Sequence, residues 1–224
     1  MCLIIHKPRH VEVPIDLLKS AAEHNPDGFG LMFFGGSSWV NVKRRRTTCF
    51  NALRRAYRSV GDQECVIHLR LRTRGDITAA NTHPFRVAPD VYMAHNGTLD
   101  IDCRVEGRSD SWHAANDYLR PILRHNPDLL HSHDFQTLLK TWIGPDNRLV
   151  FMDARRRKTV IVNREHGAEF QGLWLSNTRW FDAARFGLPQ QERIVVEPRQ
   201  SASLKPTAIN EIEWGKTAAN LRRF

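Results

Sequence analysis

Residues 1–8 read MCLIIHKP, a short apolar run with a cysteine at its head. The segment from Leu3 to Ile5 is typical of a buried β-strand, and such a strand would hold Cys2 at the edge of a sheet. Viewed alone, Cys2 is more simply interpreted as a small apolar residue that begins an edge strand. The rest of the sequence decides between this interpretation and a functional one.

Further apolar runs predict strands, and amphipathic runs between them predict helices. The strands are expected at 3–6, 29–34, 65–70, 91–96, 148–153, 159–164 and 172–177. The helices are expected at 14–24, 49–60, 111–125 and 135–144, the third with a kink at Pro121. Because the strands come in two groups without regular βαβ alternation, we predict an α+β fold of antiparallel sheets covered by helices.

The composition describes an ordinary globular chain. Its 224 residues are 41% hydrophobic, which is enough for one substantial core or two small domains. No apolar run approaches eighteen residues and no secretory signal is recognisable, so we expect a cytoplasmic protein without a membrane partner. The four cysteines show no CxxC spacing, which argues against a zinc ribbon or a disulfide framework. We expect no metal and no cofactor.

The formal charge is +9, and part of the basic excess is clustered at 43–46, 154–158 and 221–224. Such clusters raise the local concentration of anions, so one interpretation is a nucleotide or nucleic-acid partner. The alternative, which the sequence favours, is that these runs are solvated turns and helix faces. No zinc finger, P-loop or aromatic RNA-binding pattern accompanies the charge.

Three polar segments stand at predicted strand ends or helix starts, where a rigid scaffold presents functional groups: 68–85, 94–99 and 107–112. In the second, Asn96–Gly97 is a common turn signal. The same turn can instead aim an amide and a backbone N–H at one point, as in an oxyanion hole.

Two charged residues in the other segments also allow two interpretations. Asp110 could cap the helix that follows it, or its carboxylate could receive a substrate ammonium. Arg70 could be one more surface cation, or its planar fork could bind a substrate carboxylate.

The amino terminus offers a catalytic pair on a single residue. We expect Met1 to be removed because Cys2 is small, which would free the cysteine α-amine. That amine has an ordinary pKa of about 8 and the thiol about 8.5, so the amine can take the thiol proton near neutral pH. A nucleophile and its base are then present without a catalytic histidine.

Taken in order, several motifs resemble those of one known family over roughly the first 180 residues. They are MC at 1–2, NPDGFGLM at 25–32, HLRLRTRG at 68–75, NTHPF at 81–85, AHNGTL at 94–99, SDS at 109–111 and LWLSNT at 173–178. Individually MC and HNG are weak signals, but the ordered series is specific. The chain resembles the class II glutamine amidotransferases, which belong to the N-terminal-nucleophile hydrolase superfamily.

The resemblance implies a four-layer αββα sandwich and a specific reaction. Cys2 matches the nucleophile that attacks the side-chain amide of glutamine, giving a γ-glutamyl thioester and ammonia, and its α-amine matches the general base. Asn96 and Gly97 match the oxyanion-hole pair.

The resemblance also implies a set of substrate-binding residues. Arg70 matches the arginine that binds the glutamine α-carboxylate, and Thr73 and Gly75 complete its loop. Asp110 matches the carboxylate that holds the α-ammonium. His83 matches a motif residue expected near the pocket without a chemical role.

The domain expected from the resemblance covers 1–185, and 186–224 would be a C-terminal extension that packs on the domain or contacts a partner. The extension is too short for the synthase domain that larger family members carry. We therefore expect ammonia to go to a separate synthase subunit. Two alternatives stay open: a hydrolase of another γ-glutamyl amide, and a catalytically idle scaffold that binds nucleic acid.

Overall fold

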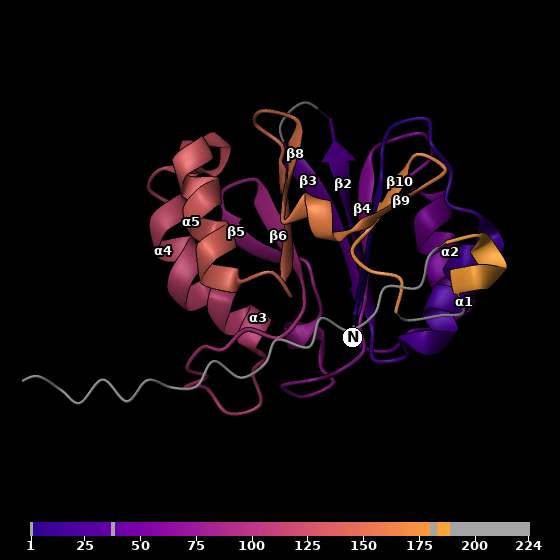
Figure 1. The fold of residues 1–224 in the computed structure, drawn as a ribbon, viewed down its shortest axis with the longest axis horizontal. Coiled ribbons are helices and arrows are strands. Elements are labelled where there is room, and N and C mark those ends of the chain that lie inside the picture. The colour runs from indigo at the N-terminus through magenta and orange to yellow at the C-terminus, as the bar shows by residue number, and fades with distance from the viewer. Residues whose placement is uncertain (1, 37–38, 180–182, 189–224) are drawn as a thin grey trace, which may run out of the picture. The chain divides into compact units, whose positions relative to one another are not determined.

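Two antiparallel sheets lie face to face between two layers of helices (Figure 1). The larger sheet has the strand order β3-β2-β4-β1-β10-β9, and the smaller has the order β5-β6-β7-β8. The strands are β1 (Leu3–Lys7), β2 (Phe29–Gly35), β3 (Trp39–Arg45), β4 (Cys65–Leu69), β5 (Phe85–Ala88), β6 (Val91–Asn96), β7 (Arg148–Asp153), β8 (Lys158–Val162), β9 (Ala168–Phe170) and β10 (Leu173–Leu175).

The helices are α1 (Ile15–His24), α2 (Phe50–Arg58), α3 (Asp110–His113), α4 (Arg120–Leu123) and α5 (His133–Ile143). In Figure 1, α1 and α2 cover the outer face of the larger sheet, and α3, α4 and α5 cover the smaller one. The predicted α+β fold, an αββα sandwich, is confirmed.

The structure is a computed structural model and describes residues 2–36, 39–179 and 183–188. These residues belong to a unit that spans Met1–Glu192. Apart from 186–188, the predicted C-terminal extension lies outside the described residues, so its boundary and its role stay predictions. Within the described residues, no helix is both long and apolar enough to cross a lipid bilayer.

Three apolar clusters correspond to the three interfaces between the layers. The cluster under α1 and α2 includes Leu17 and Leu53 packed on Phe29, and the cluster under α5 includes Ile143. The third lies between the sheets and consists of Ile4, Met32, Phe34, Val40, Val66, Ala94, Val150, Met152, Ala154 and Trp174. Because alternate residues of a strand point to opposite faces, each sheet contributes to two of these clusters.

All seven predicted strands are present, to within about two residues at their ends. Strands β3, β5 and β9 were not predicted. The basic run at 43–46 was interpreted as a turn or helix face, and this is wrong for its first three residues, which end β3. That strand lies at the edge of its sheet, where Arg44 and Arg45 remain exposed to solvent.

The helical segment that contains Pro121 is continuous but irregular. A π-helical stretch, Ala114–Leu119, joins α3 to α4 and ends two residues before the proline. In this stretch the Arg120 N–H donates to the Ala115 carbonyl, five residues back. Proline has no N–H to donate, so the wider turn lies where the regular ladder is interrupted. The predicted kink is therefore a local widening of the helix.

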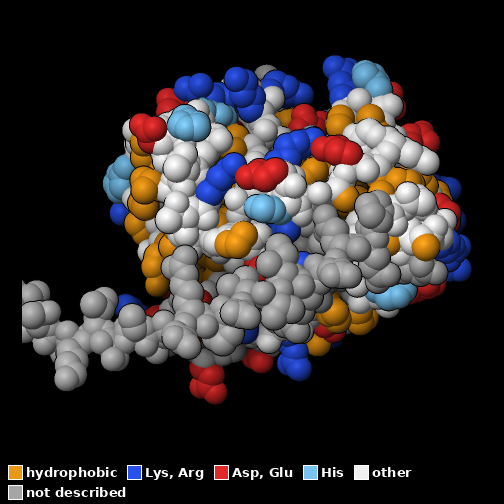
Figure 2. All heavy atoms as spheres, viewed as in Figure 1, with side chains coloured by type: hydrophobic (Ala, Val, Ile, Leu, Met, Phe, Trp, Pro, Cys, Tyr) orange, Lys and Arg blue, Asp and Glu red, His pale blue; other side chains and the backbone are white. Residues whose placement is uncertain are grey.

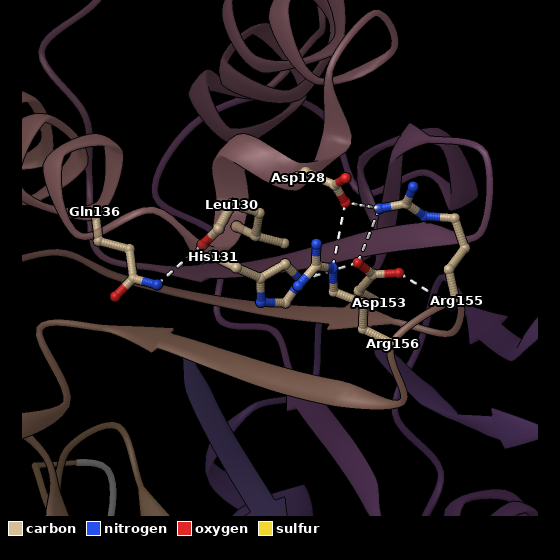
Figure 3. Close-up of polar contacts among 7 residues, drawn as sticks. All are labelled: Asp128, Leu130, His131, Gln136, Asp153, Arg155 and Arg156. Atoms are coloured by element: carbon tan, nitrogen blue, oxygen red, sulfur yellow. Dashed lines mark hydrogen bonds and ion pairs between the residues drawn. The ribbon is translucent and has the colours of Figure 1, made fainter.

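Basic and acidic side chains are interspersed on the face seen in Figure 2, with Lys and Arg gathered along its upper rim. An ion-pair network closes the β7–β8 turn (Figure 3). The buried Asp153 carboxylate accepts from His131 at 2.9 Å and from Arg155 at 3.1 Å, and Arg155 and Arg156 both bind Asp128. Of the basic cluster at 154–158, residues 154–157 form a turn, as the favoured interpretation predicted, and Lys158 begins β8; Arg155 and Arg156 are in ion pairs.

Candidate active site

The predicted site residues lie where three strands begin or end. Leu3 of β1 pairs with Leu69 of β4, so Cys2, directly before β1, and Arg70, directly after β4, lie at the same end of the larger sheet. Asn96 is the last residue of β6 in the smaller sheet. Antiparallel pairing thus places the start of one strand beside the end of another, although 68 positions separate Cys2 from Arg70 in the chain.

Ser176, the residue after β10, connects the two sheets at this point. Its side chain is fully buried, and its Oγ accepts from the Ile4 N–H at 2.8 Å. The same Oγ lies 2.7 Å from the Asn96 side-chain nitrogen. The next residue, Asn177, donates from its amide to the Cys2 carbonyl at 3.0 Å. Strand β1, which begins directly after Cys2, is therefore fixed against Asn96, the residue predicted to form the oxyanion hole.

Cys2 is partly buried as a residue, and its thiol donates to the Leu71 carbonyl at 3.4 Å. Burial raises the pKa of this thiol above the ordinary value, although the nearby Arg70 cation opposes the shift. The Asp110 carboxylate raises it further. The resting thiol is consequently protonated near neutral pH, and a nucleophilic attack requires a base that removes this proton.

Arg70 is almost entirely buried, at 3% exposure, and its guanidinium holds the loop that follows it. One terminal nitrogen donates to the Asp76 carbonyl at 2.9 Å and the other to the Arg74 carbonyl at 3.1 Å. Burial lowers the pKa of Arg70, while Cys2, Asp27 and Asp110 lie near enough to favour the cation. Cys2, Arg70 and Asp110 thus share one electrostatic neighbourhood.

The Arg70 loop packs directly against the start of α3. Gly75 has a φ of +70°, and a Cβ placed there would lie 2.6 Å from the Ser109 nitrogen, so only glycine fits. Thr98 donates to the Thr73 hydroxyl at 3.3 Å, which joins the loop to the turn after Asn96. Thr73 and Gly75 therefore shape the loop and bring it to the Asp110 segment.

Asp110 is the first residue of α3 and is 3% exposed. Its Oδ2 accepts from the Leu99 N–H at 2.7 Å. The helix cap is Ser109, whose hydroxyl accepts from the Trp112 N–H. The interpretation of Asp110 as the N-cap is wrong, because the capping oxygen comes from the residue before it.

Asn96 is buried at its turn with Gly97, and one of its side-chain polar atoms has no partner among the described residues. Gly97 has a φ of +136°, and a Cβ there would lie 2.1 Å from the Asn147 side-chain oxygen. The Asn96 Oδ1 is buried and has no hydrogen-bond partner among the described residues. Because the Ser176 hydroxyl already accepts from Ile4, it can donate its own hydrogen to this oxygen after the amide turns over. The Asn96 nitrogen would then occupy the unpartnered position and could donate to a substrate.

A chain of three side chains links this turn to α3. His95 has its Nε2 2.9 Å from the Asn147 Oδ1 and its Nδ1 2.7 Å from the Ser111 hydroxyl. The Asn147 nitrogen donates to the Ile143 carbonyl, so its oxygen is the acceptor and His95 carries its proton on Nε2. Ser111 in turn donates to Nδ1. His95 therefore fixes Asn96, its neighbour in the chain, relative to Asp110.

His83 lies in the interior rather than on the substrate loop. Its ring is 4.0 Å from that of His68 and 6.4 Å from that of His95, measured between centroids. Neither ring nitrogen of His83 has a hydrogen-bond partner among the described residues. Burial lowers the pKa of all three histidines, that of His68 to about 3. The three rings are therefore neutral parts of the wall behind the site.

The structure brings seven of the eight predicted residues to one edge of the sandwich and places His83 behind them. Sequence reasoning missed Ser176, Asn177, His95, Ser111 and Asn147, which position the others. The LWLSNT and HNG motifs contain three of these residues, but nothing in a motif says which hydroxyl faces which amide. A cavity of about 540 Å³ lies beside the site, between the loops 72–76 and 103–108.

Comparison with protein-family models gives one match. The family model described as class-II glutamine amidotransferases matches residues 16–147, a segment that contains every predicted site residue except Cys2. The search of curated proteins found no match.

Two solved structures are similar at low identity. A glutamine aminotransferase class-II domain protein from Silicibacter pomeroyi is 16% identical with a TM-score of 0.37, over 69% of this chain and 73% of that one. The glutamine phosphoribosylpyrophosphate amidotransferase from B. subtilis, complexed with ADP and GMP, is 10% identical with a TM-score of 0.42. The match covers 78% of this chain and 40% of that one. The family model matches more than half of the residues of this chain, so the chain belongs to the class-II glutamine amidotransferases.

Proposed function

We propose that the protein releases ammonia from glutamine, with Cys2 as the nucleophile after removal of Met1. The observation that carries the proposal is the convergence of the Cys2 thiol, the Arg70 cation and the Asp110 carboxylate next to the Asn96–Gly97 turn. A free amino acid needs one cation and one anion for its head group, and an amide needs a nucleophile and an oxyanion hole.

The reaction proceeds through attack of the thiol, departure of ammonia and hydrolysis of the thioester. The Cys2 α-amine takes the thiol proton, the sulfur bonds to the side-chain carbonyl carbon of glutamine, and the Asn96 amide and Gly97 N–H receive the oxyanion. The ammonium of Cys2 then returns its proton to the leaving nitrogen, the carbon–nitrogen bond breaks, and ammonia departs from a γ-glutamyl thioester. Water adds to the thioester, which yields glutamate and the free thiol.

The raised pKa of the thiol supports the need for an internal base. A protonated thiol is a weak nucleophile, whereas an amine on the same residue is positioned to remove its proton at the moment of attack.

We propose that the ammonia is used by a separate acceptor enzyme, since the cavity between the loops 72–76 and 103–108 gives a neighbouring space for an approaching molecule.

The test compares Cys2→Ser with Cys49→Ser, which changes an exposed cysteine at the start of α2. Ammonia release from glutamine should fall about 10³-fold or more in the first variant and stay unchanged in the second. Intact mass should show that Met1 is absent, and a diazo-ketone analogue of glutamine should add once, at Cys2. Retention of Met1 together with no labelling would contradict the proposal.

Substrate recognition is tested separately. Asp110→Asn and Arg70→Lys should raise KM for glutamine more than they lower kcat, because both groups bind the head group rather than the reacting amide. Turnover of a larger γ-glutamyl amide without turnover of glutamine would instead favour the alternative substrate.

A further inference from the structure

A concentration of positive charge lies on the helix-covered face of the larger sheet, between β3 and α2. The segment 28–61, which forms β2, β3 and α2, has seven Lys and Arg residues and no Asp or Glu. These cations are Lys43, Arg44, Arg45, Arg46, Arg54, Arg55 and Arg58. This is the longest stretch of the sequence without an acidic residue, so charge of one sign is concentrated here.

Part of this charge surrounds a hollow. A cavity of about 400 Å³ is lined by Lys43, Arg44 and Arg45 of β3, by Arg55 of α2, and by the apolar residues Phe29, Ala52 and Ala56. Lys43 and Arg45 pair with Leu31 and Phe29, so their side chains share the helix-facing side of the sheet. Ala52, Arg55 and Ala56 follow the spacing of one helix face. The two alanines leave the space that a larger side chain would fill.

The cations around the cavity differ from those of the β7–β8 turn. Within the described residues, no carboxylate forms an ion pair with Lys43, Arg45 or Arg55, whereas the arginines of the β7–β8 turn are paired. The Lys43 ammonium is held at the cavity by a hydrogen bond to the Ser59 hydroxyl, which itself donates to the Ala56 carbonyl at 2.7 Å. Like charges collected without a counter-charge repel one another, and a bound anion would relieve this repulsion.

The size and chemistry of the cavity indicate the ligand class. Small-molecule sites occupy roughly 300–1,000 Å³ and combine an apolar surface with a few polar groups. Arginine offers two parallel donors that match the oxygens of a phosphate, and lysine adds a point charge. We propose that this cavity binds a small molecule with two or more phosphate charges, whose uncharged part rests on Phe29, Ala52 and Ala56.

The same phosphate chemistry could come from a nucleic acid, but the geometry favours a small molecule. The cavity is partly open and its lining contains one aromatic residue, Phe29, whereas single-stranded nucleic acids are bound along grooves with several aromatic side chains on which successive bases stack. Arg54 and Arg58 belong to the same helix and do not line the cavity. They therefore provide a matched control for charge alone.

The test is isothermal titration of the full chain with pyrophosphate, with ATP, and with a single-stranded DNA oligonucleotide, at low salt. Arg45→Gln/Arg55→Gln and Arg54→Gln/Arg58→Gln each remove two charges. The first pair should raise the dissociation constant for pyrophosphate and ATP about tenfold or more, and the second by less than about threefold. Ala56→Leu, which keeps every charge and fills the hollow, should weaken ATP binding while circular dichroism stays unchanged.

Several results would overturn the proposal. They are no heat with either phosphate ligand, equal weakening by the two arginine pairs, or tighter binding of the oligonucleotide that Ala56→Leu leaves intact. The last result would assign the charge to a nucleic acid. Repeating the titration in Cys2→Ser separates this site from the glutamine chemistry, because phosphate binding should survive the loss of the nucleophile.

Discussion

Ser176 shows how much one hydroxyl can contribute to the arrangement of a site. It is fully buried and bonds to the backbone of Ile4 and to the side chain of Asn96. Removing it leaves a buried N–H and a buried amide without partners, which costs about 1–3 kcal/mol for each unsatisfied group.

We expect Ser176→Ala to lower the free energy of unfolding in urea and to lower kcat for glutamine more than it changes KM, because the Asn96 amide loses its orientation. The control is Ser20→Ala, another buried serine, in α1. Equal effects of the two variants on kcat would show that Ser176 only fills space.

Gly97 can be tested against a glycine with a similar backbone requirement. Both Gly97 and Gly61 have positive φ values, but a Cβ at Gly97 would lie 2.1 Å from the Asn147 oxygen, whereas nothing lies within 4 Å at Gly61. Gly61→Ala should cost about 1–2 kcal/mol of unfolding free energy, from backbone strain alone. Gly97→Ala should cost more and should abolish ammonia release. Activity that survives in Gly97→Ala would exclude this turn as the oxyanion hole.

At the level of the elements, the network in Figure 3 holds the β7–β8 turn to the segment before α5. Burial alone would raise the pKa of Asp153, but hydrogen bonds from His131 and Arg155 outweigh it and hold the pKa below its usual value. The charged carboxylate therefore stabilises the fold at and above the ordinary aspartate pKa of about 4, and this contribution is lost as the pH falls through the lower folded value.

Asp153→Asn should accordingly destabilise the protein at pH 7, and the difference from the unmodified chain should shrink as the pH falls below about 4. Urea unfolding at several pH values measures this. Asp102→Asn breaks an exposed ion pair with Arg104 and should change the unfolding free energy little at any pH. A difference for Asp153→Asn that is independent of pH would contradict the assigned ionisation.

The elements differ in how well the sequence predicted them. Apolar runs such as 91–96 and 148–153 are strands with those bounds, because both faces of each strand are buried. Strand β3 was missed because its last three residues, Lys43–Arg45, are all basic, and this charge dominated the interpretation. Strand β9 has only three residues, too few for a period to be visible.

The site was predicted less completely than the fold, for a physical reason. The residue types at Cys2, Arg70 and Asp110 follow from the chemistry that each can perform. Their orientations depend on loops, whose hydrogen bonds no periodicity describes. The Arg70 guanidinium bonds to the carbonyls of its own loop, and the cap of α3 is Ser109. Both contacts could be identified only from the folded structure.

For the molecule as a whole, the stacked histidines predict sensitivity to acid. The folded pKa values of His68, His83 and His95 lie below the ordinary value of 6.5, so unfolding takes up protons below that pH. The stability present above pH 6.5 should be lost progressively toward pH 3. The slope of unfolding free energy against pH should correspond to the uptake of up to about three protons on unfolding.

His83→Phe removes one of these titrations and deletes no hydrogen bond recorded for its ring. Between pH 6.5 and 4.5, the slope of unfolding free energy against pH should decrease by the equivalent of about one proton taken up on unfolding. The exposed His133→Gln should leave the slope unchanged. An unaltered slope in His83→Phe would show that this ring is not held neutral by the fold.

The hydroxyl of Ser176 also sets a condition on when the site can exist. It binds Ile4 across 172 positions of the chain and Asn96 across 80. Contacts so distant in sequence form late, because the long loops between them must close first. During synthesis, the segment around Cys2 leaves the ribosome long before its anchor is made. In a half-synthesised chain, Cys2 would therefore lack a formed active site and would not react with glutamine. In refolding experiments, ammonia release should return after the circular dichroism signal.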